Sequence, residues 1–305
     1  MEDTTLIDFE DAKLRAGDHM VRGTAADGMI RAFALTARQV VQTAHENHRT
    51  SPLVTAALGR LMMGALMMGA MFKEPDELIT LMVEGDGPVG GLTVTANCEG
   101  QVKGFANNPN VWLPLKPNGK LDVGAGVGAG TLTAIRDLPH TEPYSSQVEL
   151  VSGEIGDDLT HYFTVSDQVP SSVGVGVLVG RTQDVAQAGG FIIQLMPGYD
   201  DYLVDELEAN LAGITSVTGM LEEGLSPNDM LQRILAGLDY HETECMPVEF
   251  YCGCNEERAS RATAALGPMI LQEMIDEGET AEVYCHFCGK YHYIPVDQLK
   301  ELLEQ

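Results

Sequence analysis

The 305-residue sequence predicts an α+β protein in three parts: an N-terminal mixed sheet-and-helix domain, a helical acidic middle segment, and a small C-terminal domain with four cysteines. Three observations favour this class. Short β-rich runs separated by turn residues fill most of residues 78–198. A stretch with acidic residues and helical apolar spacing follows at 199–250. Four of the six cysteines lie within residues 251–305.

The first helices are predicted before residue 75. "GMIRAFALTA" alternates like a strand, and "ARQVVQTAHENH" spaces its apolar residues like a helix. The run at 53–72, "LVTAALGRLMMGALMMGAMF", is long enough to cross a bilayer. Arg60 inside it would cost about 3 kcal/mol in hydrocarbon, so we expect a buried core helix. Its methionines leave open an adaptable binding surface as the alternative.

The β signal dominates from residue 78 onward. The predicted strands lie in "LITLMVEGDGP", "GGLTVTANC", "QVKGFANNP", "GTLTAIRD", "QVELVSGE", "VGVGVLVG" and "GGFIIQLMPG". Residues 124–129 fit a loose dinucleotide-binding glycine pattern, but a strand follows where such a site needs a helix, so we expect a glycine-rich turn. Residues 1–198 are therefore predicted to form one α+β domain.

Residues 199–250 hold twelve acidic residues, and Arg233 is their one Lys or Arg. "DDYLVDELEANLAGI" and "SPNDMLQRILAGL" have helical spacing, with Ser226 as the expected N-cap, Pro227 in the first turn and Asp229 behind it. Short helices with this much like charge are marginal in isolation. We therefore predict a metastable helical linker that depends on docking.

Residues 251–305 are predicted to form a separate small unit. Asn255 can cap a helix that ends near Gly267, Pro268 can begin a second helix that ends at Gly278, and "EVYCHFCGKYHYI" has the pattern of a hairpin. A unit of 55 residues has a small hydrophobic core and usually needs an additional link, such as a disulfide or a bound metal ion.

Four cysteines can provide this additional link. Cys252 and Cys254 form C-x-C, Cys285 and Cys288 form C-x-x-C, and thirty residues separate the pairs. Four thiolates suit one tetrahedral, closed zinc site, whereas the spacing fits no ferredoxin run. Two nearby histidines, His286 and His292, could each replace a cysteine, but they are expected at the surface or beside the ligands.

The remaining cysteines and the overall charge restrict the function further. Cys98 and Cys245 are expected to be unpaired small side chains. A net charge of −27 argues against nucleic acid and membrane as partners, and residues 251–305 carry ten acids against four basic residues. The acidic start "MEDTTLIDFE" lacks a secretory pattern, so we expect a cytoplasmic protein. The sequence contains no catalytic motif that we recognise, and no enzyme is predicted.

The chain resembles the heat shock protein 33 family of bacterial redox-regulated holdase chaperones almost from end to end. The most specific segments are "CGCN" with "EVYCHFCGKYH", "GDGPVGGLTVTANCEGQVKGFANNP", "LVSGEIGDDLTHYFTVSDQVPSSVGVGVLV" and "AGGFIIQLMPG". The family's four-cysteine pattern falls on Cys252, Cys254, Cys285 and Cys288 without departure.

The resemblance implies a mechanism. One Zn²⁺ per chain is held by the reduced cysteines, and this form is inactive. Oxidation forms the disulfides Cys252-Cys254 and Cys285-Cys288, releases zinc, unfolds the linker and exposes apolar surface that binds unfolding client proteins without ATP. The resemblance also allows a homodimer on activation, and the sequence determines neither the oligomeric state nor the clients.

Two other functions remain open from the sequence. One is a thiol-disulfide oxidoreductase that uses Cys285 and Cys288, although such motifs normally open a helix and "GKYHYIPV" predicts a strand. The other is a binding protein with a purely structural zinc site, in which oxidation would only damage the protein.

Overall fold

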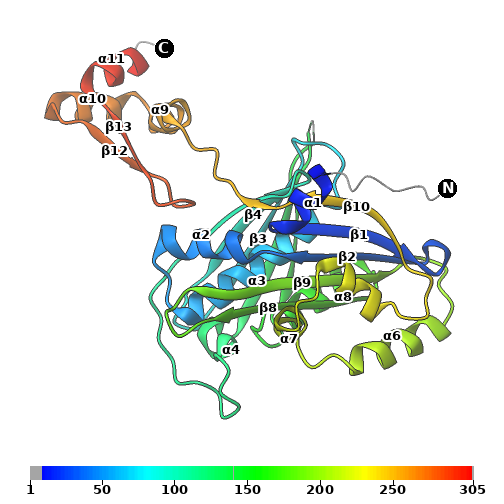
Figure 1. Ribbon diagram of the computed structural model, residues 1–305. Helices are drawn as coiled ribbons and strands as arrows, with labels where there is room; N and C mark the ends of the chain where they lie inside the picture. Colours follow the sequence, from blue (N-terminus) through cyan, green and yellow to red (C-terminus); the bar gives the residue numbers. More distant parts are fainter. Residues whose placement is uncertain (1–8, 140, 304–305) are drawn as a thin grey trace. The chain divides into compact units, whose positions relative to one another are not determined.

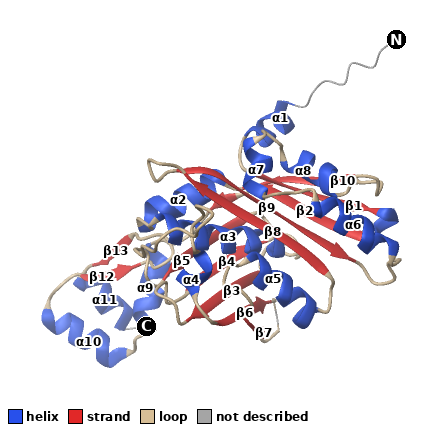
Figure 2. Cartoon of the chain, turned by 90° about the horizontal axis from the view of Figure 1, so that it is seen from below, coloured by secondary structure: helices blue, strands red, loops and turns tan. Residues whose placement is uncertain are grey.

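Two β-sheets with one long helix between them form the larger part of the structure (Figures 1 and 2). The computed structural model describes residues 9–139 and 141–303. Its chain divides into two units, Met1–Phe250 and Tyr251–Gln305, which are described in turn. The mixture of helices and sheets confirms the predicted α+β class.

The first sheet has five antiparallel strands in the order β10-β1-β2-β9-β8. Their bounds are β1 His19–Ala25, β2 Ile30–Thr36, β8 Ser171–Val179, β9 Val185–Leu195 and β10 His241–Pro247. The inner strand β9, predicted from "GGFIIQLMPG", is buried along nearly its whole length. Burial on both faces explains why this strand has a continuous apolar run instead of alternation.

The second sheet has six strands in the order β11-β5-β4-β3-β6-β7. Their bounds are β3 Leu78–Gly85, β4 Leu92–Asn97, β5 Gln101–Ala106, β6 Gly130–Asp137, β7 Tyr144–Glu149 and β11 Glu249–Phe250. Strands β3 to β6 alternate buried and partly exposed residues, as expected for a sheet with one face on the core. The short strand β11 pairs with β5 in parallel.

Helix α3, Pro52–Gly69, packs on both sheets and is buried in the core of the first unit. In the described part of the chain it is the one helix whose length and composition would also suit a membrane span, and 89% of its apolar window is buried inside the protein. Met62, Met63, Met67 and Met68 are all buried. The core interpretation is therefore confirmed, and the alternative of a methionine-rich binding surface is wrong for these four residues.

The remaining helices around the core differ in part from the sequence expectations. Helix α2, Arg38–His48, matches the prediction. The elements α1 (Phe9–Ala16), η1 (Ala26–Gly28), α5 (Gly156–Tyr162) and η2 (Phe163–Asp167) were not predicted. The expected glycine-rich turn at 124–129 instead contains a one-turn helix, α4, Val123–Val127, because the Asp122 carboxylate caps it by accepting the Ala125 N–H.

The acidic segment packs against the outer face of the five-stranded sheet through helices α6 (Tyr202–Ala212), α7 (Val217–Glu222) and α8 (Pro227–Ile234) (Figure 2). Ser226 caps α8 as predicted, with Pro227 in the first turn and Asp229 completing a capping box. The expectation of an entirely helical segment is wrong at its end. There β10 and β11 are strands, because β10 finds its hydrogen-bond partners on β1.

The second unit contains α9 (Glu256–Ala264), α10 (Pro268–Glu277), β12 (Ala281–Tyr284), β13 (Tyr291–Ile294) and α11 (Val296–Leu303). The predicted caps are confirmed: the Asn255 side chain accepts the Arg258 N–H, and α10 begins at Pro268 and ends at Glu277, with Gly278 as its C-cap. Its buried apolar core consists of Ala259, Leu271, Ala281, Ile294 and Leu299. A core this small supports the expectation that the unit needs an additional link.

Candidate metal centre

The four cysteines predicted from their spacing lie together in the second unit. The sulfur atoms of Cys252, Cys254, Cys285 and Cys288 are all within 4.8 Å of one another. The shortest recorded contacts join the two halves of the motif: Cys252 Sγ lies 3.5 Å from Cys285 Sγ, and Cys254 Sγ lies 3.4 Å from Cys288 Sγ. All six cysteines are free thiols, so the cluster has the arrangement of a reduced site.

The C-x-C half of the cluster depends on the glycine between its cysteines. Gly253 has φ of 63°, a left-handed conformation that glycine adopts without strain. A Cβ at this position would also lie 3.1 Å from the Tyr251 ring and 3.3 Å from Arg258 Nη1. Asn255 follows directly and starts α9, so the loop that carries both sulfurs is fixed at its C-terminal end by a helix cap.

The β12–β13 hairpin positions the C-x-x-C half. The Cys285 N–H donates to the Lys290 carbonyl at 2.8 Å, and the Gly289 N–H donates to the Cys285 carbonyl at 2.8 Å. Gly289 has φ of 70°, which suits the tight turn. Cys288 is buried within this turn. The predicted hairpin is confirmed, and the motif lies between two strands instead of opening a helix.

The environment differs among the thiols. Burial raises the pKa of Cys252 strongly and the pKa of Cys254 to about 11. Burial also acts on Cys285, but hydrogen bonds from the Cys252 thiol and from the backbone amides of Cys288 and Phe287 outweigh it and lower the pKa of Cys285. The protein itself therefore favours the thiolate form of Cys285.

The geometry and donor type fit a four-coordinate soft metal. A zinc ion bound tetrahedrally to four thiolates at about 2.3 Å places the sulfurs about 3.8 Å apart. The recorded separations of 3.4 and 3.5 Å and the limit of 4.8 Å bracket that value. Four soft sulfur donors in this arrangement favour zinc over magnesium or calcium, which prefer oxygen.

The His292 ring contacts the cluster. His292 Nε2 lies 3.3 Å from Cys254 Sγ. The His286 ring packs edge-on against Tyr284, with ring centroids 5.2 Å apart. In the described part of the chain, the group that could hold a metal ion comprises the four cysteines. The sequence indicated that His292 lies close to the cysteines. Which cysteine the ring contacts could not be predicted from the sequence.

The other two cysteines lie outside the cluster, as expected. Cys98 follows strand β4 and is half-buried, and Cys245 lies in β10 opposite Val21 of β1. Burial raises the pKa of both thiols, and the nearby Arg15 opposes this only in part at Cys245. A raised pKa keeps a thiol protonated and unreactive at neutral pH.

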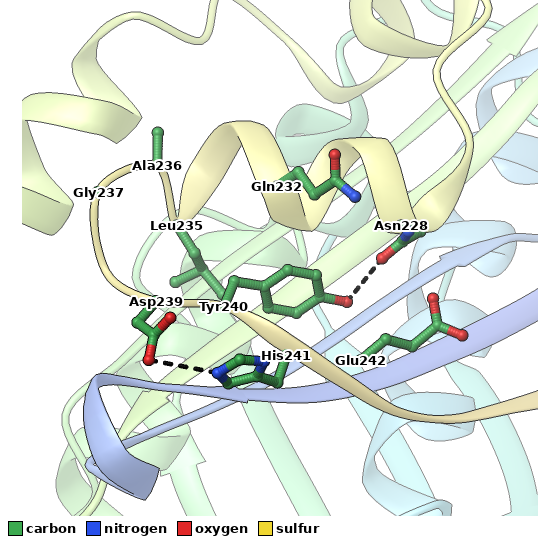
Figure 3. Close-up of a pocket in the computed structure, with 9 residues that line it drawn as sticks. All are labelled: Asn228, Gln232, Leu235, Ala236, Gly237, Asp239, Tyr240, His241 and Glu242. Carbon is green, nitrogen blue, oxygen red and sulfur yellow. Dashed lines mark hydrogen bonds and ion pairs between the residues drawn. The ribbon is translucent and has the colours of Figure 1, made fainter.

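The first unit contains an open, polar pocket of about 400 Å³ between α8 and β10 (Figure 3). The Tyr240 hydroxyl donates to Asn228 Oδ1 at 2.9 Å, and His241 Nε2 lies 3.3 Å from an Asp239 carboxylate oxygen (Figure 3). Glu242 accepts from Arg15 of α1 at 2.5 Å. These groups tie the end of the acidic segment to its neighbours, and we assign them this structural role.

The family comparison supports the sequence resemblance. The family model described as "Hsp33 protein" matches residues 18–294. The 33 kDa chaperonin of Agathobacter rectalis is 50% identical over 285 residues, which cover 93% of this chain and 99% of that protein. The 33 kDa chaperonin of Lachnoclostridium phytofermentans is 47% identical over 286 residues, which cover 94% and 98%.

A solved structure agrees as well. The crystal structure of the 33 kDa chaperonin, or heat shock protein 33 homolog, of Thermotoga maritima matches with a TM-score of 0.87 and 36% sequence identity. The match covers 94% of this chain and 98% of that chain, so the likeness includes both units and not the core sheet alone.

Proposed function

The chain belongs to the Hsp33 family, which gives it a chaperone role, and on that premise we propose that it is a redox-regulated, ATP-independent holdase of the cytoplasm. Reduced protein is inactive, and oxidation at the cysteine cluster activates it. The observation that carries the proposal is the position of the cluster. Its first cysteine, Cys252, lies two residues after the end of the acidic segment 199–250. The helices of that segment cover the apolar face of a sheet.

In the reduced form, Cys252, Cys254, Cys285 and Cys288 hold one Zn²⁺. A bound zinc ion keeps its four thiolates deprotonated and links the two halves of the motif. We expect the unit to need this link, because its core has five buried apolar residues and five partly buried ones packed against them. Structural zinc in small modules contributes on the order of 10 kcal/mol or more to folding.

Oxidation removes this link. For each pair, one peroxide accepts two electrons from two thiolates and, with two protons, becomes two waters while one S–S bond forms. The proposed pairs are the sequence neighbours Cys252-Cys254 and Cys285-Cys288, so complete oxidation consumes two peroxides. Disulfide sulfurs carry no charge and are poor ligands, so the oxidised pairs no longer hold the ion.

Loss of order in the second unit acts on the acidic segment through the chain itself. Strand β11 is two residues long, Glu249 and Phe250, and it ends two residues before Cys252. Strand β10 precedes it at the edge of the first sheet and is largely exposed. A short strand and an exposed edge strand are weak anchors, so unfolding that begins at residue 251 can spread back toward α8.

Release of the acidic segment uncovers two apolar surfaces. Leu203, Leu207, Met230, Leu231, Ile234 and Leu235 are buried in the segment's helices, and Leu211 packs beside them. On the sheet they cover Val21, Ile30, Ala32, Ala34, Phe191, Ile193 and Leu195. Unfolding client proteins expose apolar segments of the same kind, and burial of these segments against the uncovered surfaces drives binding without ATP.

The test is suppression of aggregation. The zinc-loaded, reduced protein and the peroxide-treated protein are each mixed with a heat-denatured client, light scattering is followed, and zinc release is measured in parallel. We expect protection only after oxidation, with zinc release preceding it. Equal protection in both states would overturn redox regulation. Loss of protection on oxidation would favour a purely structural zinc site.

The alternative of a thiol-disulfide oxidoreductase fits the geometry less well. Cys288 is buried, and each cysteine of C-x-x-C has a sulfur contact in the C-x-C half. A turnover assay of disulfide reduction, with excess reductant, separates this alternative from a chaperone: sustained turnover would support the enzyme.

A further inference from the structure

His292 is not one of the four cysteines, but its side chain contacts one of them. The residue lies in β13, where it pairs with Val283 of β12, and its ring is half-buried. Its Nε2 lies 3.3 Å from Cys254 Sγ. Sulfur acceptors are large, so this separation is an ordinary N–H···S hydrogen-bond distance.

The contact joins the two halves of the motif. Cys285 and Cys288 belong to the same hairpin as His292, whereas Cys254 comes from the loop before α9, 38 residues earlier in the chain. On the hairpin, Cys254 Sγ lies 3.4 Å from the Cys288 sulfur and 3.3 Å from the His292 ring nitrogen.

From this contact we infer that His292 is a positioning residue for Cys254. A metal-bound thiolate carries no proton, so the imidazole must be the donor, with its N–H on Nε2. Donation withdraws electron density from the sulfur, which makes it less nucleophilic toward oxidants, and it fixes the C-x-C loop against the hairpin. His292 thus delays oxidation at Cys254 and slows loss of the metal.

This inference rests on the proposed function, because it specifies how that same cluster is regulated. It predicts that loss of the His292 side chain accelerates the reaction of Cys254 more than that of Cys252. The rival role for His292 is that of a ligand that replaces a cysteine. Two observations favour the hydrogen-bond role. Nε2 of His292 lies against a sulfur atom, and the four sulfurs form a complete group that does not include His292.

The experiment compares His292→Ala and His292→Gln with the parent protein. Zinc release under limiting peroxide is followed with a chromogenic chelator, and labelling of each cysteine by iodoacetamide at fixed pH is followed by mass spectrometry. Removal of such ligand-orienting partners typically costs about 10–100-fold in metal affinity. We expect at least about 10-fold faster zinc release from His292→Ala and faster labelling of Cys254, with Cys252 little changed.

Two variants separate positioning from general damage. Gln keeps an N–H donor of similar reach, so His292→Gln should restore most of the parent behaviour. Tyr293→Ala changes the next residue of β13, whose side chain is 56% exposed and points to the opposite side of the strand, and it should behave like the parent. Equal effects of the Gln and Ala variants, or an Ala variant within twofold of the parent, would overturn the inference.

A last variant separates the hydrogen bond from ligation. Cys254→Ser should lose zinc if His292 only donates to sulfur, and full retention of zinc would identify His292 as a ligand and contradict the inference. The labelling rate of Cys254 can also be measured in metal-free protein. If the parent held no zinc, the proposed function would fail, while a Cys254-specific effect of His292→Ala would still support the contact.

Discussion

Asn210 of α6 holds the end of α8, because its side-chain amide donates to the carbonyl oxygen of Ile234 at 3.0 Å. The same amide nitrogen donates to the Ala236 carbonyl, also at 3.0 Å. The last carbonyl groups of a helix lack partners within the helix, so an external donor stabilises its end. This one side chain therefore links two helices of the acidic segment to each other.

Replacement of Asn210 by Ala should weaken the docked state of the acidic segment. Two hydrogen bonds at about 1 kcal/mol each give a loss of about 1–2 kcal/mol. Hydrogen exchange in reduced protein should then be about 5–30-fold faster at 228–236, and activation by peroxide should be faster. Gln232→Ala, at an exposed position on α8, serves as the control and should change neither. Unchanged exchange in Asn210→Ala would contradict a marginal α6–α8 contact.

The second prediction concerns the same amides in the parent protein. Amides at 203–211 and 228–236 should be protected when the protein is reduced and should exchange rapidly after peroxide treatment. The reason is that twelve acidic residues against one arginine oppose compaction of residues 199–250, so its helices persist only while docked. Equal protection in both redox states would leave the segment a permanently packed part of the fold.

The sequence predicted those parts of the structure whose signals are local. The caps at Ser226 and Asn255 and the buried helix α3 each follow from neighbouring residues. Strand β10, "HETECMP", has no apolar alternation, and its pairing with β1 depends on residues more than 200 positions away. Such pairing cannot be predicted from local pattern, which explains why this stretch was expected to be helical.

Helix α5 illustrates a local signal that was overlooked. The Asp158 carboxylate accepts backbone N–H groups from Val151, Ser152, Gly153 and Ile155, and it organises the turn before the helix. Acidic residues at a helix start could have indicated it. The cysteine cluster was predictable because two close pairs carry the signal. The contact from His292 to Cys254 was not, since it depends on the hairpin register.

Zinc content should depend on each cysteine of the cluster. The Cys285→Ser variant removes a cysteine whose thiolate form the protein favours, and we expect zinc far below one per chain by elemental analysis. Its second unit should lose helical signal, because the small core does not hold the unit alone. Cys98→Ser changes a half-buried cysteine outside the cluster and should retain full zinc. Full occupancy in Cys285→Ser would refute the four-thiolate assignment.

Oxidation should produce disulfides between sequence neighbours. The closest recorded sulfur pairs, Cys252–Cys285 and Cys254–Cys288, join the two halves, but all four sulfurs lie within 4.8 Å. Once the metal is lost and the unit loosens, loop closure favours partners two or three residues apart. Peptide mapping of peroxide-treated protein should therefore find Cys252-Cys254 and Cys285-Cys288. Dominant cross-links between the halves, or to Cys98 or Cys245, would contradict this order of events.

The last prediction concerns a cluster of three partly buried charged residues in the first unit. Arg60 of α3 donates to Glu154 Oε2 at 2.6 Å, and Lys116 donates to the other carboxylate oxygen. The Gly124 N–H also donates to Glu154, at 3.1 Å. Burial raises the pKa of Glu154, but the hydrogen bonds from Lys116 and Arg60 outweigh it, so the pKa is lowered overall.

A lowered pKa in the folded state stabilises the protein above the ordinary Glu pKa, and this stabilisation is lost as the pH falls through the folded value. Glu154→Gln should therefore reduce the free energy of unfolding at pH 7 by about 1–3 kcal/mol, because Arg60 and Lys116 lose a charged acceptor. The difference from the parent should shrink below about pH 4. Urea denaturation followed by circular dichroism measures it, with Glu149→Gln at an exposed position of β7 as the control. A difference that stays constant from pH 7 to pH 3 would show that the charge of Glu154 contributes nothing and that the lost stability comes from packing alone.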